Sequence, residues 1–454
     1  MSALQVNLDL IRKYNVAAPR YTSYPPATHF AEMDGQTVLE RMRANAGSGK
    51  NLSLYFHLPF CYSLCWYCGC TTVITSNQSA SAQYLEYLGR ELALMAPLIG
   101  RERKAVQLHF GGGTPTFLLP DEIRALGALI RSHFTYDENI EAGVEIDPRR
   151  LTRDHVTALR EAGFNRASMG VQDFDPQVQL AVHRIQPKAQ TEQAIDWLRE
   201  AGFASLNVDL IYGLPHQTVE SFSKTLDEVI AMQPDRLAVF NYAHVPWMKP
   251  AQKILKVLPT PEMKLELLKL TVERLTSNGY SYIGMDHFAR ADDELAIAQR
   301  NKTLQRNFQG YSTRGNTDIY AFGMSSISQA DGAYWQNQKD LPLYYKALDA
   351  GNAPISKGYV LTEEDSIRRE VISRLMCDLG LDYAKISEQL GVDFTSRFAG
   401  ELASLADLQA DGLIETDACG LRVTDLGRLL IRNIAVRFDA YFGKETGERF
   451  SKSI

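Results

Sequence analysis

Short apolar and β-branched runs alternate with amphipathic helical patterns from residue 51 to about residue 285, and this alternation limits the folds open to the chain. Strands connected through helices pair in parallel, and the active sites of such sheets gather at the carboxyl ends of the strands. Six strand–helix units are too few to close an eight-stranded barrel. We therefore predict an α/β fold in which residues 51–355 form an open, three-quarter (β/α)6 barrel. The predicted strands are 52–58, 106–110, 143–146, 167–171, 206–212 and 237–240, with a further strand at 280–285, and the predicted helices are 83–98, 121–134, 153–162, 189–201, 218–232 and 262–277.

The two ends of the chain differ in character from this central part. Residues 18–26 are rich in proline and aromatic side chains and lack a helical period, so residues 1–50 are predicted to form an extended arm that packs on the main domain. Helices are predicted near 363–379, 383–390 and 397–412, followed by short strands at 412–416 and 421–423. This order favours a small, mostly helical, winged-helix-like domain over 356–454, with a structural or lid role.

Net charge and hydropathy limit the partners that we expect this protein to bind. The 454 residues carry 48 basic and 54 acidic side chains, which gives a formal net charge of −6 and no reason to expect nucleic acid as a partner. No apolar run is long enough to span a bilayer, so membrane insertion is not expected. Residues 1–15 mix charged and apolar side chains and do not resemble a signal peptide. A cytoplasmic protein is the expectation.

Four of the six cysteines lie within ten residues: Cys61, Cys65, Cys68 and Cys70. The first three have the spacing C-x3-C-x2-C and follow the first predicted strand directly. A four-iron cluster needs four ligands, normally thiolates, so a loop that supplies three leaves one iron open to a small molecule. The alternative is a zinc site completed by Cys70, although that thiol is too close to its neighbours to reach a fourth corner easily. Cys377 and Cys419 are isolated and predicted to be small buried hydrophobic residues.

Polar side chains recur where the predicted strands end. A glycine run at 111–113 follows the second strand and would let the backbone approach a ligand closely. Glu145 and Asp209 could bind ribose hydroxyls or an ammonium group, and Arg184 could bind a carboxylate. His57 and His287 are ambiguous, since a lone histidine is more often structural. Successive strand ends place these groups around one cavity, together with Asp147, Gln172 and Asp173.

These features resemble a known superfamily. The cysteine spacing, the aromatic Tyr67 before Cys68 and the GGGTP run at 111–115 resemble the radical S-adenosylmethionine (SAM) superfamily. Longer blocks resemble the oxygen-independent coproporphyrinogen III oxidases within it. They span nearly the whole chain: PRYTSYP (19–25), LYFHLPFCYSLCWYCGC (54–70), LHFGGGTPT (108–116), VEIDPR (144–149), SMGVQDF (168–174), NVDLIYGLP (207–215), FNYAH (240–244), GMDHFA (284–289) and RNFQGYST (306–313). The alternative is a haem chaperone of the same family, which typically lacks the PRYTSYP block and the fourth cysteine.

The resemblance implies a [4Fe-4S] cluster on Cys61, Cys65 and Cys68 and two SAM molecules. Carried over by position, the residues around the SAM on the cluster are Tyr55, Gly112, Glu145 and Ile327. Those around the second SAM are Tyr67, Gly113, Thr114, Gln172, Arg184, Asp209 and Ala243. The chain departs from relatives at Trp66-Tyr67, where Tyr-Phe is frequent, and the exchange retains aromatic stacking.

The implied reaction converts coproporphyrinogen III to protoporphyrinogen IX in haem biosynthesis. Two propionate side chains each lose a hydrogen atom, CO2 and an electron and become vinyl groups. Cluster reduction requires an external electron donor, and the released electron requires an acceptor. Tyr55, Glu145 and Arg20 are the candidate catalytic residues, with Arg20 on the arm as a clamp for substrate carboxylates, or else a surface charge packed on a loop. We expect a monomer.

Overall fold

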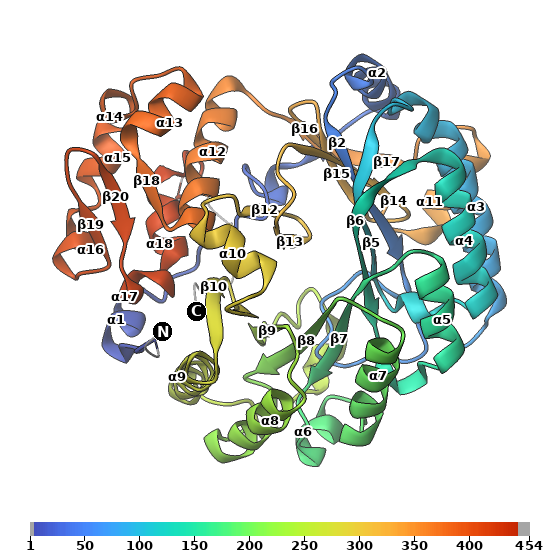
Figure 1. Cartoon of the computed structure of the whole chain (residues 1–454), viewed down its shortest axis with the longest axis horizontal. Coiled ribbons are helices and arrows are strands. Elements are labelled where there is room, and N and C mark those ends of the chain that lie inside the picture. Colours follow the sequence, from blue (N-terminus) through green and yellow to red (C-terminus); the bar gives the residue numbers. More distant parts are fainter. Residues whose placement is uncertain (1–3, 444–454) are drawn as a thin grey trace.

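The core of the computed structural model, which describes residues 4–443, is a sheet of thirteen strands in the order β1-β17-β16-β15-β14-β2-β5-β6-β7-β8-β9-β11-β10. Its central strands run parallel to one another and curve into a partial barrel (Figure 1). These strands are β14 (Thr317–Phe322), β2 (Asn51–Leu58), β5 (Lys104–Gly112), β6 (Thr135–Ile146), β7 (Arg166–Gln172), β8 (Ser205–Tyr212) and β9 (Arg236–Asn241). The six predicted parallel strands are confirmed as β2 and β5 to β9.

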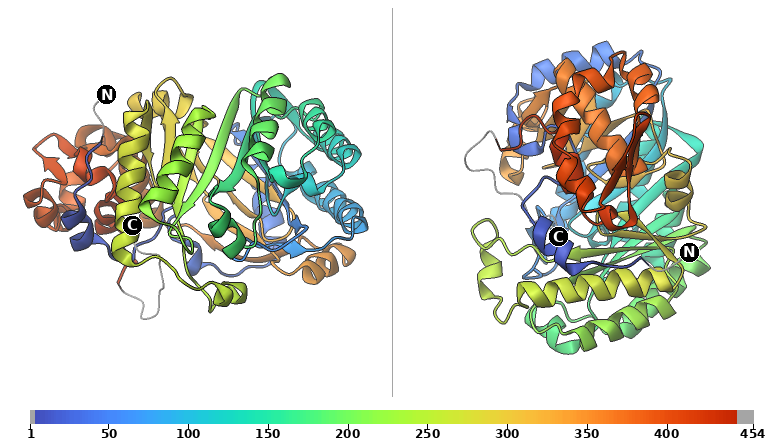
Figure 2. Two further views of the ribbon diagram at one scale, coloured as in Figure 1. Left: turned by 90° about the horizontal axis from the view of Figure 1, so that it is seen from below. Right: turned by 90° about the vertical axis from the view of Figure 1, so that its left-hand side faces the viewer.

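Helices cover the outer face of this sheet (Figures 1 and 2). Their apolar sides bury residues such as Leu88 and Leu92 in one cluster with Phe56 and Phe110 of the strands. The repeated Arg-Glu-Ala-Gly-Phe segment ends two of them, because Gly163 and Gly202 adopt positive φ angles of 99° and 76°. The crossover helices are α3 (Ser79–Met95), α4 (Pro120–His133), α5 (Arg153–Glu161), α6 (Pro176–Ala181), α7 (Lys188–Glu200) and α8 (Val219–Ala231).

Both edges of the barrel are extended by strands that run antiparallel. After α9 (Pro261–Ser277), the predicted strand at 280–285 forms β10 (Tyr280–Gly284), but it reaches β9 only through β11 (His287–Arg290). At the other edge, β14 is followed by β15 (Ile327–Ala330), β16 (Ala333–Asn337), β17 (Ile355–Val360) and β1 (Ala31–Glu32). Within residues 4–443 these outer strands, β1 and β10, do not pair with each other. The predicted open barrel is therefore confirmed, with more strands than expected.

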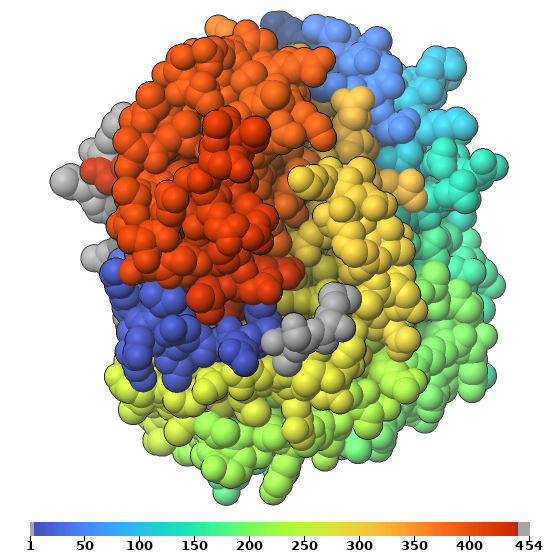
Figure 3. All heavy atoms as spheres, turned by 60° about the vertical axis from the view of Figure 1, so that its left-hand side comes forward, coloured from blue at the N-terminus to red at the C-terminus, as the bar shows by residue number. Residues whose placement is uncertain are grey.

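The N-terminal arm contacts more of the molecule than predicted. It contains two helices, α1 (Leu8–Tyr14) and α2 (Gly35–Asn45), of which neither was predicted. Tyr14, Tyr21 and Tyr24 are buried in the core of the C-terminal region beside residues such as Phe438. Figure 3 shows the blue N-terminal segment between the red C-terminal region and the yellow part of the barrel. The arm thus joins the two.

The C-terminal region has the predicted order of helices and strands, but the helix predicted at 397–412 is broken into two short helices, and another short helix precedes them. A third strand, β18, extends the hairpin to a small sheet of order β18-β20-β19. The elements are α12 (Glu363–Asp378), β18 (Gly380–Asp382), α13 (Tyr383–Leu390), α14 (Phe394–Arg397), α15 (Ala399–Ala403), α16 (Ala406–Ala410), β19 (Ile414–Thr416), β20 (Gly420–Val423), α17 (Asp425–Arg428) and α18 (Ile431–Ala435). The domain boundaries and the winged-helix class stay predictions, and their outermost parts, 1–3 and 444–454, lie outside the described residues.

Three further elements link the barrel to these additions: α10 (Glu294–Arg300), the hairpin β12 (Gln305–Asn307) with β13 (Gly310–Ser312), and α11 (Leu341–Asp349). Among residues 4–443, none of the helices combines the length and the apolar character that a membrane crossing would need.

Candidate active site

A loop between residues 59 and 75 carries the three predicted cluster ligands at the carboxyl end of β2. Its two ends are joined by a short parallel pair, β3 (Phe60–Cys61) and β4 (Val73–Ile74). Its middle is docked on the segment after α6, because Trp66 N donates to the Val182 carbonyl over 3.0 Å and the Trp66 ring stacks on His183. The loop is therefore fixed at both ends and in the middle, which holds Cys61, Cys65 and Cys68 at one edge of the barrel.

Two arginines face the buried thiol of Cys65. Arg149 Nη2 and Arg184 Nη1 each lie 3.6 Å from Cys65 Sγ. Cationic donors in this position stabilise a metal-bound thiolate. Asp147 holds both guanidinium groups, at 2.6 Å from Arg149 Nη2 and 3.4 Å from Arg184 Nη1. Burial would raise the pKa of Asp147, but the charge of Arg184 and the hydrogen bond from Arg149 outweigh it and bring the pKa to about 2, so the carboxylate is ionised.

The surroundings of Arg184 limit its predicted role. Its Nη2 donates to the Gly170 carbonyl over 2.6 Å and its Nε to Gln186 Oε1 over 3.1 Å, in addition to the contact with Asp147. The carboxylate that it binds in the structure is therefore part of the protein. Sequence reasoning missed Arg149, although the VEIDPR block that contains it follows the third strand of the barrel.

Cys70 lies beside the three-cysteine set and is exposed. Its backbone N donates to Cys68 Sγ over 3.4 Å, and its thiol lowers the pKa of Cys68 to about 6 by donating a hydrogen bond to the sulfur. In the part of the chain that the structure describes, no three His, Cys, Asp or Glu side chains are arranged to hold a single metal ion. Of the isolated cysteines, Cys377 is buried as predicted, but Cys419 is exposed, because it lies in the turn between β19 and β20.

The glycine run at 111–113 passes directly beneath the cysteine loop. Gly113 N donates to the Leu58 carbonyl over 2.8 Å, and a Cβ atom at Gly113 would lie 2.5 Å from the Pro59 oxygen. Gly112 has φ +115°, which favours glycine, and its N–H donates to Glu145 Oε2 over 3.1 Å. This close passage brings Thr114 Oγ1 within 3.7 Å of Cys61 Sγ.

Tyr55 and Glu145 lie on neighbouring parts of the inner face of the barrel. The Tyr55 hydroxyl lies 3.2 Å from His57 Nδ1, and its ring stacks on His109 with 5.8 Å between centroids. His109 Nε2 lies 3.5 Å from Glu145 Oε1. Burial would raise the pKa of Glu145, but His109 and the Gly112 N–H lower it, so the group is ionised. The Glu145 side chain is 45% exposed and hence accessible to a ligand.

Two buried amide oxygens at strand ends are without a hydrogen-bond partner among the described residues. They are Gln172 Oε1 on β7 and Asn241 Oδ1 on β9. A buried polar atom without a partner is costly, which indicates that a ligand or water completes each one. Gln172 was predicted as a site residue, and its φ of 70° turns the chain at the end of β7. Asn241 was missed, although it belongs to the FNYAH block.

Asp209 lies deeper in the barrel on β8. It accepts hydrogen bonds from Asn207 Nδ2 over 2.7 Å and from Ser168 Oγ over 3.2 Å. Burial and the nearby charge of Glu145 raise its pKa to about 7. Asp209 and Glu145 therefore differ in charge near neutral pH, although both are carboxylic acids.

The remaining predicted site residues lie in other parts of the barrel and on the arm. Tyr67 packs among Val182 and Leu214, and its carbonyl accepts from Gln252 Nε2 over 3.0 Å. Ala243 is exposed just after β9, and Ile327 begins β15. Arg20 is separate from the cysteine loop: it binds Asp286 Oδ2 over 2.8 Å in the turn between β10 and β11, the last two strands of the sheet order, whereas β2 lies in the middle of that order.

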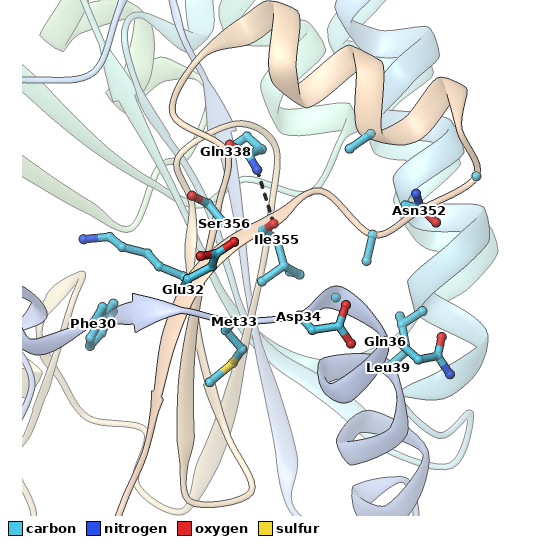
Figure 4. Close-up of a pocket in the computed structure, with 15 residues that line it drawn as sticks. Phe30, Glu32, Met33, Asp34, Gln36, Leu39, Gln338, Asn352, Ile355 and Ser356 are labelled. Atoms are coloured by element: carbon cyan, nitrogen blue, oxygen red, sulfur yellow. Dashed lines mark hydrogen bonds between the residues drawn. The ribbon is translucent and has the colours of Figure 1, made fainter.

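Two cavities differ in their relation to these residues. The larger, about 1020 Å³, lies between the arm, β17 and α11, where residues such as Glu32, Gln36 and Ser356 line it (Figure 4), and it contains none of the predicted site residues. The smaller, about 140 Å³, lies inside the barrel and is lined by His109, Ser168 and Asn207 among others. Because these residues contact Glu145 and Asp209, the inner cavity is the one that belongs to the site.

The residues present fit an iron–sulfur cluster with a bound small molecule. Three thiols lie in one fixed loop, with cationic donors directed at Cys65. The glycine run leaves no space for a Cβ atom at Gly113, and the unpartnered amide oxygens of Gln172 and Asn241 lie at the same edge. These groups provide ligands for iron and a polar surface for an organic cofactor.

Comparison with known proteins agrees with this chemistry. Residues 55–229 match the family model of the radical SAM superfamily, and residues 361–430 match that of the HemN C-terminal domain. Relatives named oxygen-independent coproporphyrinogen III oxidase occur in Synechocystis sp., with 47% identity over 99% of this chain and 98% of that protein, and in Escherichia coli, with 47% identity over the full length of both.

A solved structure gives the same result. The coproporphyrinogen III oxidase of Escherichia coli, described as a radical SAM enzyme, matches 97% of this chain and 100% of its own with a TM-score of 0.92 and 46% identity. These relatives do not favour the haem-chaperone alternative, and a zinc-stabilised barrel does not account for them. The chain belongs to the family of oxygen-independent coproporphyrinogen III oxidases, within the radical SAM superfamily.

Proposed function

We propose that this chain catalyses the oxygen-independent oxidative decarboxylation of two propionate side chains of coproporphyrinogen III to vinyl groups, giving protoporphyrinogen IX for haem biosynthesis. The observation that carries the proposal is the three-thiol loop at the carboxyl edge of an open barrel, in a chain that matches oxidases of this name along their whole length. In this proposal the large, flat substrate enters through the open side of the barrel.

Cys61, Cys65 and Cys68 hold a [4Fe-4S] cluster in this proposal, and two SAM molecules bind beside it. Together these cofactors supply one-electron chemistry that removes a hydrogen atom from an unactivated carbon. Arg149 and Arg184 donate to Cys65 Sγ and stabilise its thiolate. The residues assigned to the first SAM are Tyr55, Gly112, Glu145 and Ile327, and those assigned to the second are Tyr67, Gly113, Thr114, Gln172, Arg184, Asp209 and Ala243.

The two carboxylates of the barrel have different tasks in this scheme. Glu145 is ionised and partly exposed, so it binds a cationic or hydroxyl group of the first SAM. Asp209, with a pKa of about 7, accepts a ribose hydroxyl when it is ionised. Tyr55 packs between His57 and His109 and, together with Glu145, would line the site of the first SAM. Arg20 binds a substrate carboxylate from the arm.

The remaining requirements of the reaction concern partners. Each turnover needs an external electron donor for the cluster and an external acceptor for the electron released with CO2. We also propose a monomer that works in the cytoplasm without nucleic acid, consistent with its six free cysteines and net charge of −6.

Anaerobic product analysis tests this function. Reduced enzyme with reconstituted cluster is incubated with SAM and coproporphyrinogen III, and the oxidised porphyrins are separated by chromatography. Protoporphyrin IX and an intermediate with one vinyl group are expected, in proportion to SAM consumed. Binding of haem without any vinyl product would instead support the chaperone alternative and refute the proposal.

A further inference from the structure

Arg306, on β12, has a buried guanidinium group that the rest of the protein leaves largely unused. Its Nε and Nη1 atoms are shielded from solvent and have no hydrogen-bond partner within residues 4–443. Its Nη2 makes one long contact, 3.4 Å, with the Arg20 carbonyl. The guanidinium carbon lies 4.7 Å from the ring centre of Tyr311, which fixes the plane of the group. Burial of an arginine with unpaired donors is costly unless a ligand completes them.

Two more arginines converge on the same place from other parts of the chain. Arg20, on the arm, binds Asp286 Oδ2 over 2.8 Å and remains 39% exposed. Arg432, on α18, donates from Nε to the Pro19 carbonyl over 3.0 Å and from Nη2 to the Ala18 carbonyl. Arg432 thus holds the arm in the position that places Arg20 beside Asp286.

These three arginines, Arg20, Arg306 and Arg432, form one arginine group. Asp286 is the carboxylate that acts on all three. Burial and the charge of Arg306 lower the pKa of the adjacent His287 to about 4, so this histidine is neutral at pH 7 and adds no charge. Burial and the charge of Arg20 likewise lower the pKa of Arg432, to about 10.

Arg20 and its partner Asp286 lie at the carboxyl edge of the barrel. β10 runs in the same direction as β9, because both pair antiparallel with β11. The turn at Met285 and Asp286 is therefore at the carboxyl ends of the strands, the same edge as the cysteine loop. Both residues of this turn have positive φ angles, 46° and 73°, and Val239 N donates to the Asp286 carbonyl over 2.8 Å. The turn is thus fixed to β9.

We propose that Arg306, together with Arg20, binds the carboxylates of the propionates that do not react, and so orients the macrocycle toward the cysteine loop. The inference rests on the proposed function: coproporphyrinogen III has four propionates, of which two are converted, so two carboxylates need partners throughout. Unpartnered donors on both edges of the Arg306 guanidinium and the exposed part of Arg20 match this need. Arg432 is a positioning residue, since its donors hold the arm.

Arg306→Gln tests the proposal, with Arg290→Gln as the matched control. Arg290 lies at the end of β11 away from the turn at Met285 and Asp286, is 45% exposed and pairs with a surface carboxylate, Asp292, at 3.4 Å. Equilibrium binding of the stable porphyrin coproporphyrin III to the holoenzyme is followed by fluorescence and compared with its tetramethyl ester, which lacks the charges. KM and kcat are measured in the anaerobic product assay, and SAM cleavage is measured without substrate.

The proposal predicts that Arg306→Gln weakens binding of the tetra-acid at least tenfold, leaves ester binding within twofold, and raises KM more than it lowers kcat. Cluster absorbance and substrate-free SAM cleavage should stay at the wild-type level, and Arg290→Gln should match the wild type throughout. An unchanged preference for acid over ester in Arg306→Gln would overturn the proposal while the proposed function stands. If wild-type enzyme forms no vinyl product, the function fails, and the acid–ester comparison still decides whether Arg306 binds carboxylates.

A second variant covers the case in which Arg306→Gln does not fold. Arg20→Gln changes a side chain with an exposed portion and should lower the same acid–ester preference at least threefold with normal cluster content. Retention of the full preference by Arg20→Gln, with Arg306→Gln unfolded, would count against the carboxylate site and for a purely structural arginine group.

Discussion

Glu91 on α3 is a fully buried carboxylic acid whose removal should change how stability depends on pH. Three donors surround it: the Gly323 N–H and the Tyr344 hydroxyl, both at 2.7 Å from Oε2, and Asn337 Nδ2 at 2.6 Å from Oε1. Burial raises its pKa to about 7 despite these hydrogen bonds. The contacts tie α3 to the segment between β14 and β15, which leads to Ile327.

The sign of the effect follows from proton binding. The ordinary pKa of this group is 4.5, so between about pH 4.5 and pH 7 the folded chain holds a proton that the unfolded chain has lost. Stability from Glu91 is therefore complete below pH 4.5 and declines as the pH rises through 7. Linkage with these two pKa values gives a loss of about 2.5 kcal/mol between pH 5 and pH 8. Glu91→Gln cannot ionise and loses this dependence, although its amide must face one of the three donors.

Urea unfolding of the anaerobic holoenzyme at pH 5 and pH 8 measures the effect. The quantity compared is the free energy of unfolding of Glu91→Gln minus that of the wild type. This difference should rise by about 2.5 kcal/mol from pH 5 to pH 8, because only the wild type loses stability when Glu91 ionises. Taking this difference removes the contribution of all other titrating groups. Glu86→Gln on the same helix is the control, because Glu86 is 61% exposed and paired only on the surface. A change below about 1 kcal/mol in Glu91→Gln would refute the buried-proton reasoning.

Three further outcomes follow from the cysteine loop and the barrel. Cys65→Ser should abolish the visible absorption of the cluster and all vinyl product, whereas Cys70→Ser should retain the cluster. Loss of the cluster in Cys70→Ser would mean that the ligands are wrongly assigned. Gly113→Ala should reduce SAM cleavage at least tenfold, because its Cβ atom would overlap the Pro59 oxygen, whereas Gly69→Ala in the cysteine loop has open space and should be tolerated. The affinity for SAM should rise as the pH passes 7 in the wild type, where Asp209 ionises, and stay flat in Asp209→Asn; a parallel rise in the variant would exclude Asp209.

The strands and helices that were predicted correctly are those whose own residues show a recognisable apolar pattern. β2 and β5 to β9 are apolar runs separated by amphipathic helices, and their parallel pairing follows from that order alone. The cysteine loop was equally accessible, because its three thiols lie within eight residues and follow β2 directly. Glu145 and Gln172 were found because the carboxyl end of a parallel strand is a predictable position.

Pairings between distant segments were not predictable in this way. β14 pairs with β2 although more than 250 residues separate them, and nothing local indicates which edge of the sheet a late strand joins. β15 and β16 are short and contain serine and glutamine, so their alternation is weak. Arg149 and Asn241 were missed because an arginine or an asparagine after a strand is common. Their importance comes from their surroundings. Arg149 donates to Cys65 Sγ, and Asn241 Oδ1 has no protein partner within residues 4–443.

The contacts of the arm explain why a barrel of this kind carries a C-terminal domain. Arg20 reaches Asp286 only if the chain at Ala18 and Pro19 is fixed, and the carbonyls of these two residues bind Arg432. Tyr21 adds a second attachment, since its hydroxyl donates to Asp439 over 2.9 Å. We therefore infer that the C-terminal domain supports the open side of the barrel through the arm, in a structural role. Because Arg306 also contacts the Arg20 carbonyl, the barrel, the arm and the C-terminal domain meet at the arginine group.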